Sequence, residues 1–289
     1  MSAFDAFLDK AWADHGERPE EVAQRLEQGY TLIETPAQIA PFARILAHVD
    51  GEHLARWRGG AERLERLRTH AQWRADGDAP TIVRRLVAAM HFGNGDEPAE
   101  SLDRAERAHA HAVVAAALAA QDDLQGAIGH FRNALADASS GLDDGEPAIR
   151  ALAVTSNNLA ATLEEKEMRS VDETAAMVDA AKAAREYWAR AGGWLETERA
   201  EYMLAKCLLA AGNPEDALLH AERCAAICDA NDADAFERFF AQGRLAAVHR
   251  ALGDDRRAAQ ARTAALALYA ALPAQQKEGC DEMLRELRS

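Results

Sequence analysis

Two cysteine residues have the spacing that comes nearest to a metal site in this sequence. Cys224 and Cys228 are four residues apart, so on a helix their thiolates would share one face and could hold a cation together. A structural zinc site needs a second pair of ligands, and Cys207 is the one plausible neighbour. We therefore interpret Cys224 and Cys228 as small buried hydrophobic residues.

The histidines are spaced less favourably than the cysteines. His109 and His111 are two residues apart, so on a helix they point to different sides. His48 and His53 are five residues apart, which is also a poor separation for two ligands of one site on an α-helix. Neither pair predicts a metal site.

Catalytic patterns are missing from the sequence as well. It contains no H-E-x-x-H zinc-protease pattern, no glycine-rich nucleotide loop and no G-x-S-x-G nucleophile turn. The many carboxylates are solvated, and no isolated pair lies in an apolar setting that would support acid–base catalysis. We predict that the protein is not an enzyme and has no cofactor and no metal ion.

The elements that must position any binding residue are helices. Short polar breaks such as "HGERP" at 15–19, "RAGGW" at 190–194 and "AGNPED" at 211–216 separate stretches with apolar residues at helical spacing. The best β-like run, "YTLIET" at 30–35, is too short and isolated to build a sheet. The sequence therefore predicts an all-α fold.

Composition restricts both the core and the partners. Hydrophobic residues make up 48% of the 289 residues and aromatic residues only 6%, while alanine alone accounts for close to a quarter. Such a chain favours helices packed closely side by side over a thick core. A net charge of −15 repels phosphate groups, so we predict no binding to nucleic acid and none to membranes.

The N-terminal segment and the longest uncharged stretch bear on localisation. "MSAFDAFLDKAWADHG" has acidic residues and no basic region, unlike a signal peptide. Residues 108–121 are uncharged but fall short of the roughly 20 residues that span a membrane. We expect a cytoplasmic protein with reduced cysteines, and the preference for arginine over lysine suggests a bacterial source.

A small residue recurs at a long, regular interval in the second half of the chain. "LLAAGNPEDALLHAERCAAI" (208–227) and "HRALGDDRRAAQARTAALAL" (249–268) align with an offset of 41 residues, which places Ala217 on Ala258. "ALAAQDDLQGAIGHFRNALA" (117–136) has the same form, and residues 157–187 match if their turn carries extra residues. Because small side chains let two helices approach closely, this pattern predicts repeated helical hairpins.

These segments resemble the tetratricopeptide repeat, a pair of antiparallel helices, A and B, with small residues where the two touch. The small positions of the four copies read Ala115, Ala127, Ala134; Ala160, Ala176, Ala183; Ala205, Ala217, Cys224; and Ala246, Ala258, Ala265. The repeat length and the "SNNLA" of one helix A are similar to the kinesin light chain class and its bacterial relatives. The resemblance implies a right-handed α-α superhelix of such hairpins, an α-solenoid. Two family features are weak here, because only Phe131 keeps the helix B aromatic residue and most copies lack the closing proline.

The resemblance also predicts a domain organisation. We expect residues 1–104 to form N-terminal helices that include a degenerate hairpin at about 36–72, with Trp57 in its turn and Gly60 at its small position. Residues 105–270 are expected to hold four repeats, at 105–140, 148–190, 197–230 and 236–270. Residues 273–289 are expected to form a C-terminal capping helix with a polar outer face. Whether residues 73–105 form a full repeat stays open.

Asn157 and Asn158 stand in the middle of an alanine-rich helix, where an asparagine amide competes for backbone hydrogen bonds. In the resembled family, helix A lines a concave groove, and asparagines there hold the backbone of a bound peptide through their donor and acceptor groups. The alternative is that the two residues cap or solvate a helix that begins near Ser156. Both interpretations stay open at this point.

Matching positions in the other copies complete a candidate peptide site. The predicted groove residues are His109, Asn157, Asn158, Tyr202, Lys206, Phe240 and Arg244. Lys206 and Arg244 are cations in a very acidic chain, which suits an acidic segment or a C-terminal carboxylate as partner. Lys206 could instead be a surface charge, or pair with Glu201 or Glu222.

The resemblance implies a non-enzymatic scaffold or adaptor that binds a protein segment or peptide in the concave groove. An alternative is a regulatory sensor whose groove binds a small peptide or metabolite and controls a partner protein. A basic DNA-binding domain would favour the sensor, but acidic residues interleave the one basic run, at 56–68. Fold analogy names neither partner nor pathway, and the sequence leaves the oligomeric state open.

Overall fold

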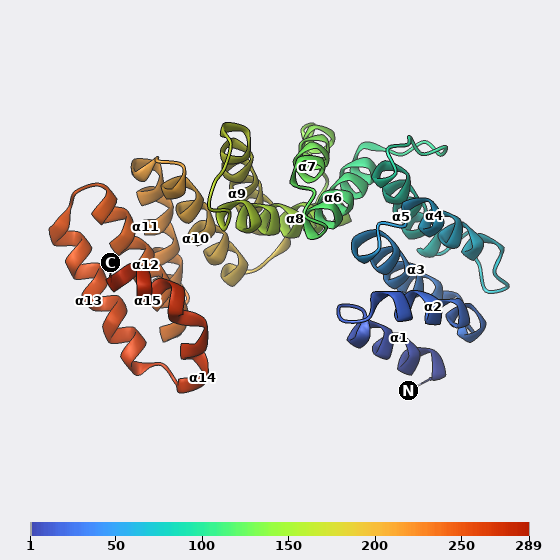
Figure 1. The fold of residues 1–289 in the computed structure, drawn as a ribbon, viewed down its shortest axis with the longest axis horizontal. Coiled ribbons are helices and arrows are strands. Elements are labelled where there is room, and N and C mark those ends of the chain that lie inside the picture. The colour runs from blue at the N-terminus through green and yellow to red at the C-terminus, as the bar shows by residue number, and fades with distance from the viewer. Residues whose placement is uncertain (1, 289) are drawn as a thin grey trace. The chain divides into compact units, whose positions relative to one another are not determined.

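Alanine-rich segments between polar breaks form helices throughout residues 2–288, the part of the chain that the computed structural model describes. These residues include no β-strand, so the fold is all-α, as predicted (Figure 1). The chain divides into two compact units, Met1–Thr155 and Ser156–Ser289, which we call the N-terminal and C-terminal units.

Helix starts are fixed by side chains that accept hydrogen bonds from free backbone N–H groups. Asp103 accepts from the N–H of Glu106, and the Glu106 carboxylate accepts in return from the N–H of Asp103. Ser170 and Glu173 form the same reciprocal pair at the start of the helix Val171–Ala191. Such a capping box satisfies two of the donors that a helix start leaves unpaired, which explains why these helices begin where they do.

The N-terminal unit is a set of helices packed around a large apolar core and a smaller apolar cluster. Its elements are α1 (Ala3–Asp14), α2 (Pro19–Gly29), η1 (Tyr30–Leu32), η2 (Pro36–Gln38), α3 (Ile39–Ala47), η3 (His48–His53), α4 (Trp57–Arg66), η4 (Leu67–Thr69), α5 (Ala79–Gly93), α6 (Arg104–Ala120), α7 (Leu124–Ala138) and the first part of α8 (Pro147–Glu164). Leu26, Phe42, Ile45 and Leu64 are fully buried in the core. Larger apolar residues thus fill the core around α2, α3 and α4, whereas α6 is rich in buried alanine.

The segment 36–72 contains α3 and α4, and the connection between them is not a simple turn. It is a π-helix, η3, in which the backbone hydrogen bonds reach one residue further than in an α-helix. Gly60 on α4 packs directly against it: a Cβ atom there would lie 3.1 Å from the Asp50 Cβ and 2.9 Å from the Met90 sulfur. The close approach of α4 to η3 therefore requires the small residue at position 60.

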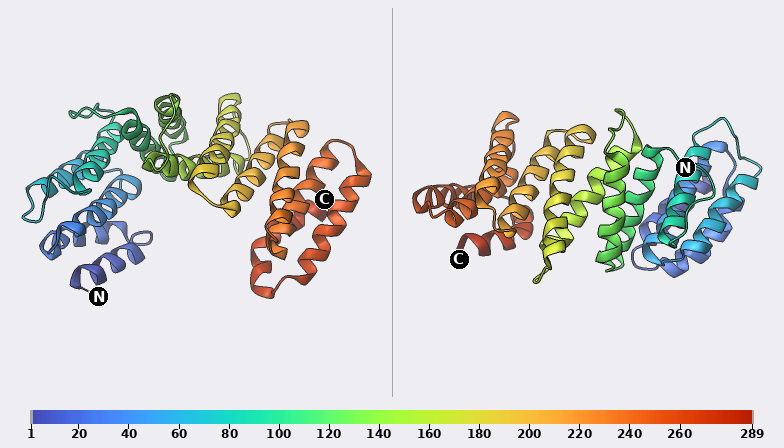
Figure 2. Two further views of the ribbon diagram at one scale, coloured as in Figure 1. Left: turned by 180° about the vertical axis from the view of Figure 1, so that it is seen from behind. Right: turned by 90° about the horizontal axis from the view of Figure 1, so that it is seen from above.

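The C-terminal unit consists of paired long helices. Its elements are the remainder of α8, α9 (Val171–Ala191), α10 (Trp194–Ala210), α11 (Pro214–Ala230), α12 (Ala235–Ala251), α13 (Asp255–Ala271), α14 (Ala274–Lys277), η5 (Glu278–Cys280) and α15 (Asp281–Arg288). Figure 2 shows α10 to α13 side by side. Ala205 on α10 and Ala217 on α11 are fully buried, and Ala176 on α9 and Cys224 on α11 are at most 1% exposed. Small residues therefore lie where neighbouring helices touch.

The last helix, α15, packs against α12. Met283 of α15 lies over Gly243 of α12, where an added Cβ would come within 2.3 Å of the Met283 sulfur. Met283, Leu284 and Leu287 are buried with Phe239 in one apolar cluster. The end of the chain therefore covers part of the α12 surface and is held there by apolar contacts.

Within residues 2–288, none of the helices combines the length and the apolar character that crossing a membrane requires.

Candidate functional site

A cavity of about 440 Å³ lies in the C-terminal unit, on residues of α8, α10 and α12 together with the end of α9. Its lining residues are Asn157, Trp188, Glu196, Glu198, Arg199, Tyr202, Met203, Phe236, Glu237 and Phe240. We call it the C-terminal cavity. Its walls combine aromatic rings with carboxylates, a pairing that small ligands and single side chains of a partner can use.

The aromatic wall of the C-terminal cavity is held in place by ring contacts and one hydrogen bond. The rings of Tyr202 and Phe240 meet nearly edge-on with centroids 6.0 Å apart, and those of Phe236 and Phe240 are 5.0 Å apart. Arg244 Nη2 donates to the Tyr202 hydroxyl oxygen at 3.0 Å, and this hydrogen bond holds the Tyr202 ring in place. Aromatic faces attract cations, so this wall suits a positively charged group.

Glu198 is the unusual carboxyl of the cavity. The residue is only 1% exposed, and its Oε1 accepts a hydrogen bond from the Cys224 thiol at 2.9 Å. Its Oε2 is buried and has no hydrogen-bond partner among residues 2–288. Burial raises the pKa of Glu198 to about 7, since few compensating donors offset the loss of water. The cavity therefore offers an acceptor atom that the protein itself does not use.

The other two carboxylates of the cavity have partners. Glu196 accepts a hydrogen bond from the Gly193 N–H at 2.8 Å, at the start of α10. Glu237 forms an ion pair with Arg199, which spans the cavity wall between α10 and α12. Glu198 is therefore the lining carboxylate that carries an unused acceptor atom, and it adds a negative charge to the cavity once it is ionised.

Lys206 and Arg244, expected as open groove cations, are already neutralised within the chain. Lys206 Nζ lies 2.7 Å from Glu164 Oε2 and 2.9 Å from Glu282 Oε1. Arg244 is 2% exposed, and its Nη1 donates to Glu286 Oε1 at 3.1 Å. Glu282 and Glu286 both belong to α15, so the C-terminal helix takes the place that we expected an acidic partner to occupy. The carboxylates paired with Lys206 are thus Glu164 and Glu282, and not Glu201 or Glu222 as the sequence suggested; Glu201 binds Arg185 and His220.

His109, the predicted groove residue of the first copy, lies in a different cavity. This cavity, of about 470 Å³, belongs to the N-terminal unit and is lined by apolar residues such as Trp57, Leu86 and Met90. Burial, together with the nearby Arg85 cation, lowers the pKa of His109 to about 4, so the imidazole is neutral at physiological pH. His109 is therefore not part of the C-terminal cavity.

Comparison with known proteins identifies the fold. No protein-family model and no curated protein sequence matches the chain. Among solved structures, BtubC (BKLC) from P. vanneervenii is 17% identical, covers 94% of this chain and 92% of its own, and has a TM-score of 0.52. A Podosopora anserina protein with nearly identical kinesin light chain TPR-like repeats is 19% identical over 76% of this chain and 97% of its own, with a TM-score of 0.47. The apo form of RapI is 12% identical over 92% of this chain and 65% of its own, with a TM-score of 0.49.

This chain has a TPR-like all-α repeat fold. In the repeats expected from the sequence, α8, α10 and α12 take the positions of A helices, and residues of all three line the C-terminal cavity.

Helix α8 begins at Pro147, ten residues before Asn157, so neither asparagine caps its start. Asn157 lines the C-terminal cavity, and its Nδ2 donates to Asn158 Oδ1 at 3.4 Å. Asn158 is exposed and is not among the cavity residues. Of the predicted groove residues, the C-terminal cavity thus brings together Asn157, Tyr202 and Phe240.

The sequence did not indicate the acidic residues of the C-terminal cavity. Glu196 and Glu237 are separated by the same 41 residues as Ala217 and Ala258, and this repeat offset could have placed them side by side. Glu198 has no such signal, because the equivalent position one repeat later is Phe239. Its contact with Cys224, 26 residues away, depends on how α10 and α11 pack.

Proposed function

We propose that this TPR-like protein is a non-enzymatic scaffold that binds a protein segment on the A-helix surface of its C-terminal unit and takes a cationic side chain of that segment into the C-terminal cavity. The observation that carries the proposal is the unpartnered Oε2 of Glu198 in a cavity walled by aromatic rings. A lysine or arginine side chain supplies the missing donor and stacks against the rings. No catalytic step is involved.

The unpartnered Oε2 of Glu198 supports a basic partner in preference to the acidic one expected from the sequence. Lys206 and Arg244 have carboxylate partners of their own, and an acidic segment would have to displace Glu282 and Glu286 before it could use them. A basic side chain meets no such competition at Glu198. We therefore propose that α15 itself is the acidic segment that Lys206 and Arg244 bind. An external acidic peptide could bind these two cations only after α15 had moved away from them.

Selection from a randomised peptide library displayed on phage tests the proposal without a known partner. We expect the full-length protein to retain peptides enriched in lysine or arginine at one fixed position. The Glu198→Gln variant should lose this enrichment, because an amide removes the charge while keeping the size of the side chain. Phe240→Ala should weaken binding of the same peptides by removing part of the aromatic wall.

The matched control is Glu222→Gln, which removes an exposed carboxylate on α11 that does not line the cavity. It should select the same peptides as the unmodified protein. Enrichment of aspartate or glutamate, or a basic preference that survives Glu198→Gln, would show that the segment binds elsewhere. Circular dichroism of each variant distinguishes lost binding from lost folding.

A further inference from the structure

Three histidines converge in the N-terminal unit, although His15 is 33 residues from His48 in the sequence. One ring nitrogen from each of His15, His48 and His53 lies within 4.8 Å of those of the other two, and this is the one such group of metal-binding side chains among residues 2–288. The ring centroids are 4.9 Å apart for His15 and His48 and 5.1 Å apart for His15 and His53. We call this group the histidine cluster.

The π-helix explains why two of these residues meet. In an α-helix, residues five apart point to different sides, which is why the sequence argued against a shared site. The wider turn of η3 brings His48 and His53 onto one side, and their Nε2 atoms are 3.2 Å apart. Two nitrogen ligands of a tetrahedral zinc ion, each about 2.05 Å from the metal, are about 3.3 Å apart. The observed separation, at which the two rings also hydrogen-bond to each other, is therefore close to the one that a shared ion requires.

Hydrogen bonds that the Nδ1 atoms donate hold two of the imidazoles in place. His48 Nδ1 donates to Glu52 Oε2 at 3.0 Å, and His15 Nδ1 donates to the Trp12 carbonyl oxygen at 2.5 Å. Both acceptors place the ring proton on Nδ1, so each Nε2 keeps the lone pair that a metal ion requires. A carboxylate or backbone carbonyl behind a histidine is the usual outer partner of a metal ligand.

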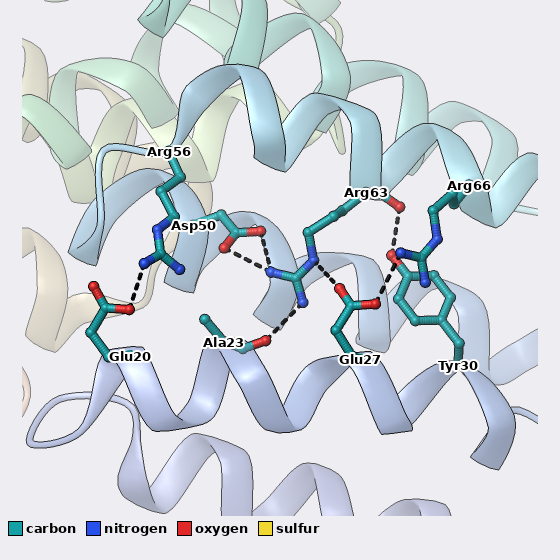
Figure 3. Close-up of polar contacts among 8 residues, drawn as sticks. All are labelled: Glu20, Ala23, Glu27, Tyr30, Asp50, Arg56, Arg63 and Arg66. Atoms are coloured by element: carbon teal, nitrogen blue, oxygen red, sulfur yellow. Dashed lines mark hydrogen bonds and ion pairs between the residues drawn. The ribbon is translucent and has the colours of Figure 1, made fainter.

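The backbone that carries His48 and His53 is firmly anchored. Asp50, in the middle of η3, is 1% exposed and accepts two hydrogen bonds from Arg63 Nη1, at 2.8 and 2.7 Å. Arg63 also donates to the Ala23 carbonyl at 3.0 Å and pairs with Glu27, as Figure 3 shows. From the other side, Gln121 Nε2 donates to the carbonyl of Gly51 at 2.6 Å. The π-helix is therefore a held conformation and not a frayed helix end.

We propose that His15, His48 and His53 bind one divalent transition-metal ion, zinc being the best match, with solvent completing its coordination. Three neutral imidazoles suit zinc, copper or nickel and not calcium or magnesium, which prefer oxygen ligands. The His48 side chain is 23% exposed, so an ion can enter from solvent and a water molecule can remain bound to it. The ion would tie the end of α1 to η3.

Titration of the metal-free protein with cobalt(II) and zinc(II) tests this site directly. Tetrahedral cobalt bound by histidine gives intense visible absorption, and we expect it to saturate at one ion per chain and to be displaced by zinc. Zinc should also raise the thermal unfolding midpoint, because an ion that binds only the folded state stabilises it. His15→Ala, at the exposed end of α1, should abolish the tetrahedral spectrum while leaving η3 intact.

Graded variants separate a built site from casual binding to surface histidines. Glu52→Ala keeps all three ligands but removes the outer partner of His48, so zinc affinity should fall roughly 10- to 100-fold. His130→Ala is the matched control, because His130 and His111 form a second histidine pair, with Nδ1 atoms 3.0 Å apart, outside the cluster. The control should keep both the spectrum and the stabilisation. Absence of a tetrahedral cobalt spectrum, or a spectrum that survives His15→Ala, would overturn the proposal.

Discussion

Glu198 combines a proposed role in binding with a cost to stability. Its carboxyl group is buried beside two thiols, and Glu237 adds negative charge nearby while Arg199 offsets it in part. Burial raises the pKa to about 7 from the ordinary value of 4.5. The protonated form is therefore favoured in the folded protein, and ionisation at higher pH works against folding.

Replacing Glu198 by glutamine should remove this pH dependence. Because the folded pKa is raised, the unfolded chain ionises first, and stability is lost as pH rises from about 4.5 through about 7. The free energy of unfolding of the unmodified protein should fall by up to about 3 kcal/mol more than that of Glu198→Gln across this window. Urea unfolding at several pH values measures the difference.

Glu222→Gln, on the exposed face of α11, provides the comparison for general effects of losing one negative charge. Its pH profile should run parallel to that of the unmodified protein. If Glu198→Gln also runs parallel, the Glu198 carboxyl is ionised normally in the folded state and the cavity lacks the acceptor that we describe.

Predictability at the residue scale depends on whether a contact is local. The buried small positions, such as Ala205 and Ala217, could be found because the repeat offset makes them recur in the sequence. The cost of Asn157 to helix formation singled it out in the sequence, and the structure places it in the wall of the C-terminal cavity. The partner of Lys206 on α15 is 76 residues away, and no local pattern indicates a contact of that kind.

At the scale of elements, α15 and η3 are the features that the sequence did not reveal. The sequence predicted helix over 273–289 but not the surface it covers, because an amphipathic pattern states which face is apolar and not which neighbour receives it. A π-helix differs from an α-helix by one residue per hydrogen bond, and the sequence of 48–53 contains no signal for that difference. Helix α15 supplies the carboxylates that pair with Lys206 and Arg244, and η3 brings His48 and His53 together.

The two glutamates of α15 should contribute unequally to the stability of the C-terminal unit. Glu286→Ala leaves the buried guanidinium of Arg244 without its carboxylate, and we expect a loss of roughly 2–3 kcal/mol. Glu282→Ala should cost less than about 1 kcal/mol, because the Glu282 side chain is 71% exposed and Lys206 keeps Glu164. Thermal or urea unfolding of the two variants gives the comparison. If both variants lose less than about 1 kcal/mol, the ion pairs contribute little and α15 is held by its apolar residues.

At the scale of the whole molecule, the net charge of −15 sets how partners approach. A surface of one prevailing sign attracts oppositely charged molecules over distances of about one Debye length, which shrinks from about 30 Å at 0.01 M salt to about 3 Å at 1 M. This long-range attraction acts on the rate of association, whereas buried contacts act mainly on the rate of dissociation. The two contributions can therefore be separated experimentally.

A basic peptide selected by the protein should associate more slowly as salt concentration rises. Stopped-flow fluorescence with a labelled peptide measures the association rate at each salt concentration. Glu198→Gln should leave the slope of this salt dependence nearly unchanged, because one buried charge adds little to the field of the whole surface, but it should raise the dissociation rate. An association rate that does not depend on salt would mean that the acidic surface does not guide the peptide. A variant that changes the slope and leaves dissociation unaltered would place the peptide's charge outside the cavity, on the general surface.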